Sequence, residues 1–169
     1  MEKVFKDFVI RDWAVGDRTA AANVVKTVLS EYGLGWEVNC GGCSDQDAVD
    51  VEKHYWETGG EFWVIARGGE IVGTGGYHPI PRGNKAAEIR KMYLLPTARG
   101  HGLGRYLLAQ LEQAAAAKGF AEAWVETATV LSKAVRLYER NGYVPAEGVE
   151  TARCDKVYRK QILKLGAQP

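Results

Sequence analysis

The segment that most constrains the fold is a strand that runs through a glycine-rich turn into a long helix. Residues 88–95 predict a strand that ends at Pro96, and apolar residues spaced by three or four predict a helix over roughly 103–118. Between them lies Arg99-Gly-His-Gly-Leu-Gly104. Glycines let backbone N–H groups approach an anion, and the helix start directs its free N–H groups to the same point. The segment therefore predicts an anion site, suited to a pyrophosphate.

Two common nucleotide-binding patterns do not match this turn. Counted from Gly100, the third glycine of a dinucleotide fingerprint would fall on Arg105. A Walker-type loop needs Lys and then Ser or Thr after its last glycine, whereas Gly104 is followed by Arg105 and Tyr106. On this turn alone, a cofactor loop and an ordinary glycine-rich connection both stay open.

Periodicity over the rest of the chain predicts an α/β fold in a single domain, residues 1–169. Asp17 is expected to cap the first helix, and Gly33 and Gly119 are expected to end helices. The expected strands cover 4–13, 62–66, 71–78, 88–95, 123–127, 143–146 and 156–163, and the expected helices cover 17–32, 47–56, 103–118 and 131–140. A tight turn at 67–70 makes a hairpin of the second and third strands. This order gives a mixed sheet with helices on both faces.

Composition excludes several classes of protein. The 169 residues are 46% hydrophobic and 25% charged, which is typical of a globular domain. The net charge of +1 gives no reason to expect a nucleic-acid or membrane partner. The start lacks a signal-peptide pattern, and no apolar run is long enough to span a bilayer, so we expect a cytoplasmic protein.

The cysteines do not form a complete metal motif. Cys40 and Cys43 enclose two glycines, which is half of a zinc site or a redox pair, but Cys154 stands alone and no second pair exists. An odd number of cysteines fits a reducing compartment better than a disulfide framework. We therefore expect two thiols in a glycine-rich loop and no metal.

Four short motifs between residues 88 and 143 occur in a recognisable order. They are Met92-Tyr-Leu-Leu-Pro96, Arg99-Gly-His-Gly-Leu-Gly104, Lys118-Gly119-Phe120 and Ala134-Val-Arg-Leu-Tyr-Glu-Arg-Asn-Gly-Tyr143. Together they resemble the GNAT superfamily of N-acetyltransferases, in which the second motif reads Arg/Gln-x-x-Gly-x-Gly/Ala. The resemblance implies a mixed, mostly antiparallel twisted sheet with helices on both faces. It also implies transfer of an acetyl group from acetyl-CoA to a primary amine.

The resemblance implies which residues bind acetyl-CoA. The strand before the turn pairs with the pantetheine arm, and the turn binds the pyrophosphate through backbone amides. The matching residues are Met92, Tyr93 and Leu94 on the strand, and Arg99, Gly100, His101, Gly102, Leu103, Gly104 and Arg105 on the turn. Many family members have an Asn where this chain has Leu131, so Ser132 is the candidate replacement for that contact.

The resemblance also implies catalytic residues. Glu88 begins the cofactor strand in an Ala-Glu-Ile context and is the candidate base, with Glu126 as the second candidate; Glu88 as an exposed charge at a strand edge stays open. Tyr138 matches the general-acid tyrosine, and its alternative role is aromatic packing. An alkyl thiol and a tyrosine have similar pKa values of about 10, so proton transfer between them is feasible.

The acceptor is expected to bind near residues 30–60 and 77–84, where aromatic residues gather. The candidate residues are Arg90, Tyr77, His78 and Trp36. Arg90 lies two positions after Glu88 on one strand face, so it either holds the carboxylate of an amino acid or forms a surface salt bridge. The preferred acceptor is a small-molecule amine. A protein lysine or N-terminus, and a non-catalytic acyl-CoA sensor, stay open, as do a monomer and a homodimer.

Overall fold

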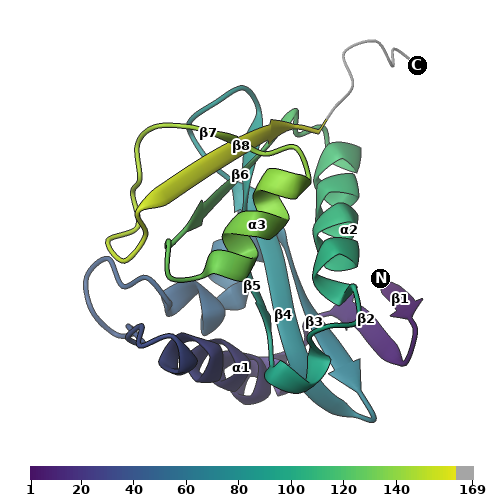
Figure 1. The fold of residues 1–169 in the computed structure, drawn as a ribbon. Coiled ribbons are helices and arrows are strands. Elements are labelled where there is room, and N and C mark those ends of the chain that lie inside the picture. The colour runs from purple at the N-terminus through teal and green to yellow at the C-terminus, as the bar shows by residue number, and fades with distance from the viewer. Residues whose placement is uncertain (163–169) are drawn as a thin grey trace.

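The sheet carries helices on both of its faces (Figure 1). The structure, a computed structural model, describes residues 1–162. Their strands form one sheet in the order β1-β2-β3-β4-β5-β6-β8-β7, and only β5 and β6 run parallel. The strands are β1 (Glu2–Phe5), β2 (Phe8–Asp12), β3 (Glu61–Arg67), β4 (Glu70–Pro79), β5 (Ala86–Leu94), β6 (Glu122–Thr127), β7 (Val144–Pro145) and β8 (Lys156–Gln161). The expected mixed, mostly antiparallel sheet is confirmed.

The described residues form three α-helices and four shorter helical turns. They are α1 (Arg18–Glu31), α2 (Leu103–Ala117) and α3 (Ser132–Arg140), and the turns are η1 (Val15–Asp17), η2 (Gln46–Ala48), η3 (Glu52–Trp56) and η4 (Pro96–Ala98). No helix in residues 1–162 combines the length and the apolar character needed to cross a bilayer. Residue 163, the last of the expected final strand, lies outside the described residues.

Alternation along β3 explains how both faces are covered. Trp63 and Ile65 belong to the largest buried cluster, together with Leu107 of α2. Phe62 and Val64 point to the other face, where they join a cluster that contains residues of α1 and η3. Successive side chains of a strand face opposite sides, so one strand contributes to both cores.

Two adjacent glycines on β4, Gly75 and Gly76, let both layers approach the sheet closely. A Cβ atom at Gly75 would lie 3.2 Å from side-chain atoms of Leu107 and Leu111 of α2. A Cβ atom at Gly76 would lie 2.9 Å from the Tyr55 ring of η3. These two glycines therefore set how near α2 and η3 sit to the centre of the sheet.

Three local predictions were wrong. The strand expected over 4–13 is a hairpin, β1 and β2, whose turn at Lys6 and Asp7 carries no glycine or asparagine signal. The helix expected over 47–56 is divided into η2 and η3. Asp17 does not cap α1 through its side chain, because its carboxylate binds Arg11 and the Ala14 N–H instead.

The parallel strands β5 and β6 separate soon after they pair. They are in register only from Ala86 to Glu88 on β5 and from Glu122 to Trp124 on β6. Beyond that point β5 continues beside β4 and β6 continues beside β8. An irregularity in the β4–β5 ladder, where Lys91 has a φ of 51°, marks the divergence. The sheet thus opens between β5 and β6.

Candidate active site

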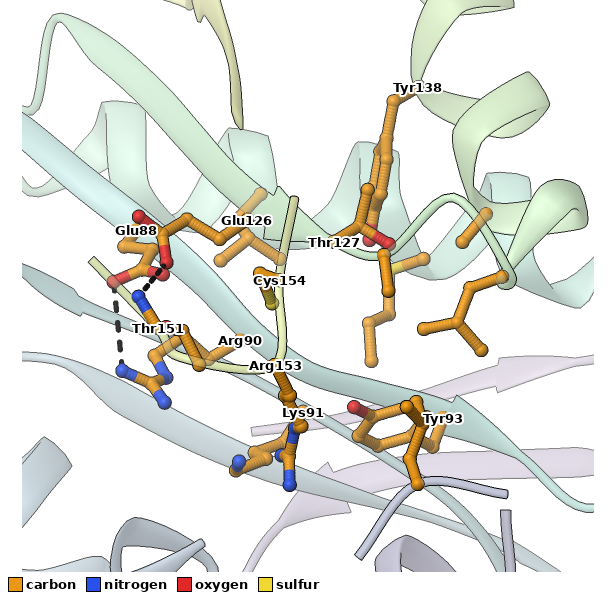
Figure 2. Close-up of a pocket in the computed structure, with 16 residues that line it drawn as sticks. Glu88, Arg90, Lys91, Tyr93, Glu126, Thr127, Tyr138, Thr151, Arg153 and Cys154 are labelled. Atoms are coloured by element: carbon orange, nitrogen blue, oxygen red, sulfur yellow. Dashed lines mark hydrogen bonds and ion pairs between the residues drawn. The ribbon is translucent and has the colours of Figure 1, made fainter. Parts of the chain in front are cut away.

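The opening between β5 and β6 forms a deep hollow of about 60 Å³ (Figure 2). β5 supplies residues 88–93 to its wall, β6 and the residues after it supply 126–128, and α3 supplies Ala134 and Tyr138. Thr151, Arg153 and Cys154 come from the segment between β7 and β8. Residues far apart in the sequence therefore meet where the two parallel strands separate.

A second, larger hollow of about 410 Å³ adjoins the first and runs toward the glycine-rich turn. Its wall is mainly apolar and is shared between α1, β5, the turn and α3. Six of the residues predicted for the cofactor strand and turn line it: Met92, Tyr93, Leu94, Arg99, Gly100 and Gly104. We call this hollow the cofactor cleft.

The glycine-rich turn presents backbone rather than side chains to the cleft. Gly100 and Gly102 both have a φ of 79°, a left-handed conformation that other residues rarely adopt. Gly102 directly precedes α2, whose first turn has N–H groups without partners inside the helix. This geometry suits an anion such as a pyrophosphate.

The Arg99 side chain serves the fold more than a ligand. Its Nη1 and Nη2 atoms donate to Glu31 at 2.6 and 2.7 Å, and its Nε donates to the Leu94 carbonyl at 2.9 Å. The charge of Arg99 is therefore already paired. The side chain ties the end of α1 to the end of β5 and so fixes the walls of the cofactor cleft.

The other predicted cofactor residues take different positions. The His101 ring packs against Phe8 with ring centroids 5.4 Å apart, and Leu103 is buried in the main core, so neither side chain lines the cofactor cleft. Ser132 lies at the start of α3 but does not line the cofactor cleft, whereas its neighbours Leu131 and Lys133 do. Arg105 lines a separate basic hollow between α2 and α3.

Glu88 presents a carboxylate to the deep hollow. Its side chain is 12% exposed, and its Oε2 atom lies 3.5 Å from Nε2 of His78 and 3.8 Å from Nη1 of Arg90. No donor in residues 1–162 lies within hydrogen-bond distance and geometry of this carboxylate. Glu88 thus lies near the Arg90 guanidinium while its oxygens accept no hydrogen bond from the described residues.

Glu126 faces the same hollow but is fully engaged. It accepts hydrogen bonds from the backbone N–H groups of Glu150 and Thr151 at 2.7 and 2.8 Å and pairs with Arg82 at 3.1 Å. Burial raises the pKa of Glu126, but these hydrogen bonds and the Arg82 charge outweigh it and leave the pKa below its usual value. Glu126 is therefore a weaker base than an unengaged glutamate.

Tyr138 enters the deep hollow from the side opposite Glu88 and Glu126, as Figure 2 shows. Burial, with smaller contributions from Tyr93 and Cys154, raises the pKa of Tyr138 above its usual value. Burial likewise raises the pKa of the Cys154 thiol to about 11. Both groups accordingly keep their protons at neutral pH, and Tyr138 is available as a proton donor.

The four predicted acceptor residues do not gather in one place. Tyr77 is fully buried and packs on the opposite face of β4 against Phe120. Trp36 packs against a small cluster under α1 and does not line either hollow. His78 lies beside Glu88, and Arg90 lies on the same strand face as Glu88, as expected.

A buried ionic cluster in the wall of the deep hollow was not predicted from the sequence. Nζ of Lys91 lies 2.8 Å from Asp45 and 3.3 Å from Asp47, and it donates to the Ser44 carbonyl at 2.7 Å. Arg153 makes two hydrogen bonds to Asp45 at 2.5 and 2.7 Å, and Nε of Arg90 lies 3.1 Å from Asp47. The cluster joins the 36–48 segment, β5 and the segment before β8. No local pattern marks these residues.

The cysteine loop also departs from expectation. Cys40 and Cys43 form a disulfide with Cα atoms 5.4 Å apart, whereas we expected two free thiols. The intervening Gly41 and Gly42 allow the tight turn that brings them together, with Gly42 at a φ of 74°. Residues 1–162 contain no group of three or more His, Cys, Asp or Glu side chains placed to hold a metal ion.

Comparison with known proteins places this arrangement in a family. Residues 30–143, more than half of the 169-residue chain, match the Acetyltransferase (GNAT) family. The chain belongs to the GNAT family of acetyltransferases. Membership makes it an acyl-CoA-dependent N-acetyltransferase that uses acetyl-CoA, and the cofactor cleft with its glycine-rich turn fits that co-substrate.

Curated relatives support the same family. YjgM, an uncharacterized N-acetyltransferase of Escherichia coli (strain K12), is 34% identical over 80% of this GNAT chain and 81% of its own length. N-acetyltransferase 8 of Rattus norvegicus is 30% identical over 66% of this chain. The chain spans about half, 52%, of the length of that rat relative.

Solved structures agree with this GNAT fold. An acetyltransferase of the GNAT family from Staphylococcus aureus Mu50 superposes with a TM-score of 0.81 at 16% identity, covering 92% of this chain and 99% of that chain. The structure of yncA from Salmonella typhimurium with its cofactor acetyl-CoA gives a TM-score of 0.72 at 18% identity, covering 97% and 98%. At these identities the likeness concerns the fold.

Proposed function

We propose that this GNAT enzyme transfers the acetyl group of acetyl-CoA to the primary amine of a small molecule, with Glu88 as base and Tyr138 as acid. The observation that carries this proposal is the position of Glu88, which lines both the deep hollow and an outer hollow of about 250 Å³ that adjoins it. The outer hollow lies between residues 42–44 and 150–152. Its volume suits a small amine whose nitrogen reaches Glu88. We place the reaction in the cytoplasm.

The first step of the proposed reaction is removal of a proton from the acceptor amine. An alkylammonium with a pKa of about 10 is protonated at neutral pH and cannot attack a thioester. The Glu88 carboxylate takes that proton, directly or through a water, and the freed nitrogen attacks the thioester carbonyl. Backbone N–H groups along Met92 to Leu94 are the candidate donors to the oxygen on which negative charge develops.

The last step of the proposed reaction is transfer of a proton to the leaving CoA sulfur. When the carbon–sulfur bond breaks, the CoA sulfur leaves as a thiolate, and the Tyr138 hydroxyl supplies its proton. The attacking nitrogen loses a second proton, which restores the proton on Tyr138. The net products are the amide, the thiol and the one proton that Glu88 releases. Tyr138 can take this role because it lines the deep hollow and carries its proton at neutral pH.

The charges around the outer hollow favour an acceptor amine that carries no carboxylate group. Arg90 already contacts Asp47 at 3.1 Å and donates to the Ser44 carbonyl at 3.3 Å. An amino-acid carboxylate would have to compete with these partners for the guanidinium. A plain amine meets no such competition, and Glu88 offers it an acidic partner.

The test is a screen of primary amines for thiol release from acetyl-CoA, with mass spectrometry of the product. We expect turnover with one or more small amines. Acetylation of peptides alone, with no small amine accepted, would reassign the enzyme to a protein lysine or N-terminus. Acetyl-CoA binding without any turnover would favour the sensor function.

Two substitutions test the residue roles. Tyr138→Phe keeps the ring and removes the proton, so kcat should fall by roughly 10²–10⁴ with nearly unchanged acetyl-CoA binding. Glu88→Gln should lower the rate at neutral pH and recover at high pH, where the amine loses its proton unaided. Tyr143→Phe is the matched control, because Tyr143 packs on Tyr138 at 5.5 Å between ring centroids but does not line the hollow.

The substitutions can also refute the assignment. Full activity of Tyr138→Phe would leave Tyr138 as a packing residue. A wild-type pH profile in Glu88→Gln would pass the base role to Glu126, His78 or water.

A further inference from the structure

A basic hollow of about 470 Å³ lies between α2 and α3, outside the residues discussed as catalytic. Its lining contains no acidic side chain and four cationic ones. The lining residues are Arg105 on α2, Lys133, Arg136, Leu137 and Arg140 on α3, and Asn141 directly after α3. The formal charge of this lining is therefore +4, in a protein whose net charge is +1.

Helical spacing brings these cations together. Lys133, Arg136 and Arg140 are separated by three and four residues, so they share one face of α3. Arg105 lies in the first turn of α2 and faces them across the hollow. All four are exposed.

None of the four forms a salt bridge with an acidic group of residues 1–162. The cations of the deep hollow differ, since Arg90, Lys91 and Arg153 each contact a carboxylate. Nearby acids are already engaged: Glu31 holds Arg99, and Glu139 accepts a hydrogen bond from Tyr158. Like charges brought together repel one another, and an anionic ligand would relieve that repulsion.

The basic hollow continues the cofactor cleft. Lys133 and Leu137 line both of them, and Gly100 and Gly104 line the cleft next to these two residues. The thioester end of the cleft lies at Met92 and Tyr93, which also line the deep hollow. A CoA molecule that starts at the deep hollow and passes the glycine-rich turn would bring its nucleotide to the basic hollow.

We propose that the basic hollow binds the 3′-phosphate of the CoA nucleotide, and that this contact makes the enzyme select acetyl-CoA over thioesters that end at phosphopantetheine. The proposal rests on the use of acetyl-CoA and is independent of the acceptor. A phosphate monoester carries a charge of nearly −2 at neutral pH, which CoA has at this position and 3′-dephospho-CoA lacks. Arginine forks match phosphate oxygens in geometry as well as charge.

The experiment is isothermal titration calorimetry with CoA and 3′-dephospho-CoA, on the wild-type protein and on the double variant Arg136→Gln/Arg140→Gln. We expect wild type to bind CoA at least about tenfold more tightly than 3′-dephospho-CoA, the ratio that one charge-assisted hydrogen bond supplies. The double variant should bring the ratio close to one by weakening CoA alone. The matched control, Lys26→Gln/Lys53→Gln, removes two exposed cations outside the hollow and should keep the wild-type ratio.

Three outcomes would overturn the proposal. Equal affinity of wild type for the two ligands would show that the 3′-phosphate does not contribute to binding. An unchanged affinity ratio in the double variant would show that other residues bind the 3′-phosphate. A double variant that binds CoA normally but loses affinity for an acetylated acyl carrier protein would assign the hollow to an acidic protein surface. No binding of either ligand by wild type would instead contradict the use of acetyl-CoA itself.

Discussion

The buried Lys91 yields a prediction about both stability and acceptor binding. Lys91→Met keeps an unbranched side chain of similar length and removes the charge. The Lys91 side chain is 3% exposed and that of Asp45 is 0% exposed, so the lost partner cannot simply be replaced by bulk water. The variant should fold less stably, and the segment that carries Asp45 and Asp47 should be held less firmly against β5.

The size of the effect follows from which partners remain. Removing one member of a buried ion pair costs about 3–5 kcal/mol, because the other charge is left uncompensated. Here Asp45 keeps Arg153 and Asp47 keeps Arg90, at 2.5 and 3.1 Å. We therefore expect a loss at or just below the lower end of that range, about 2–3 kcal/mol, in the free energy of unfolding. For a chain of this length, that lowers Tm by about 4–12 °C.

The assay combines thermal or urea unfolding with steady-state kinetics. Acetyl-CoA affinity should stay near the wild-type value, since Lys91 does not line the cofactor cleft, while the acceptor KM should rise. The matched control is Lys160→Met, which breaks a more exposed ion pair with Glu112 and should cost no more than about 1 kcal/mol. A Lys91 variant as stable as this control, or one that loses acetyl-CoA affinity instead of acceptor affinity, would refute the reasoning.

Three further predictions concern the cofactor cleft, acid and metals. Gly104→Val should abolish the rise in Tm that acetyl-CoA causes, because a Cβ at Gly104 would lie in the cleft 3.8 Å from Leu137 and 3.9 Å from Leu94; a normal thermal shift would contradict the cleft assignment. The pKa of Asp45 is lowered to about 2: burial raises it, but Arg153 and Lys91 outweigh burial, so its stabilisation is present above about pH 4 and is lost as the pH falls toward 2. In urea unfolding, the wild-type protein should therefore be less stable at pH 3 than at neutral pH. The Asp45→Asn variant should show a smaller difference between the two pH values. Activity should survive a strong chelator, and a loss that zinc restores would revive a metal role for Cys40 and Cys43.

Much of the fold could be predicted because its signals are local. The β3–β4 hairpin, the helix ends at Gly33 and Gly119 and the strand–turn–helix unit around Gly100 each depend on residues within a few positions of one another. The turn at Lys6 and Asp7 was missed because its local signal is weak. It joins β1 to β2 and contains neither glycine nor asparagine, and Asp7 alone is too weak a signal to predict a hairpin.

The candidate site divides in a similar way. Glu88, the glycine-rich turn and Tyr138 lie in motifs that can be read along the chain, and the structure brings Glu88 and Tyr138 to one hollow. Tyr77 and Trp36 were chosen for being aromatic in the right region. Side-chain alternation on β4 turns Tyr77 to the opposite face of the sheet from His78, and Trp36 packs under α1.

The sequence by itself determined the strand, the turn and the helix that we propose to bind acetyl-CoA, since hydrogen bonding and backbone conformation there depend on neighbouring residues. Only the tertiary structure decided which charges are free. Asp45, Lys91 and Arg153 lie dozens of residues apart, and they meet because β5 and β6 separate and two loops close over the gap. Their pairing satisfies charges that burial would otherwise penalise, whereas the four cations of the basic hollow have no acidic partner in the described residues.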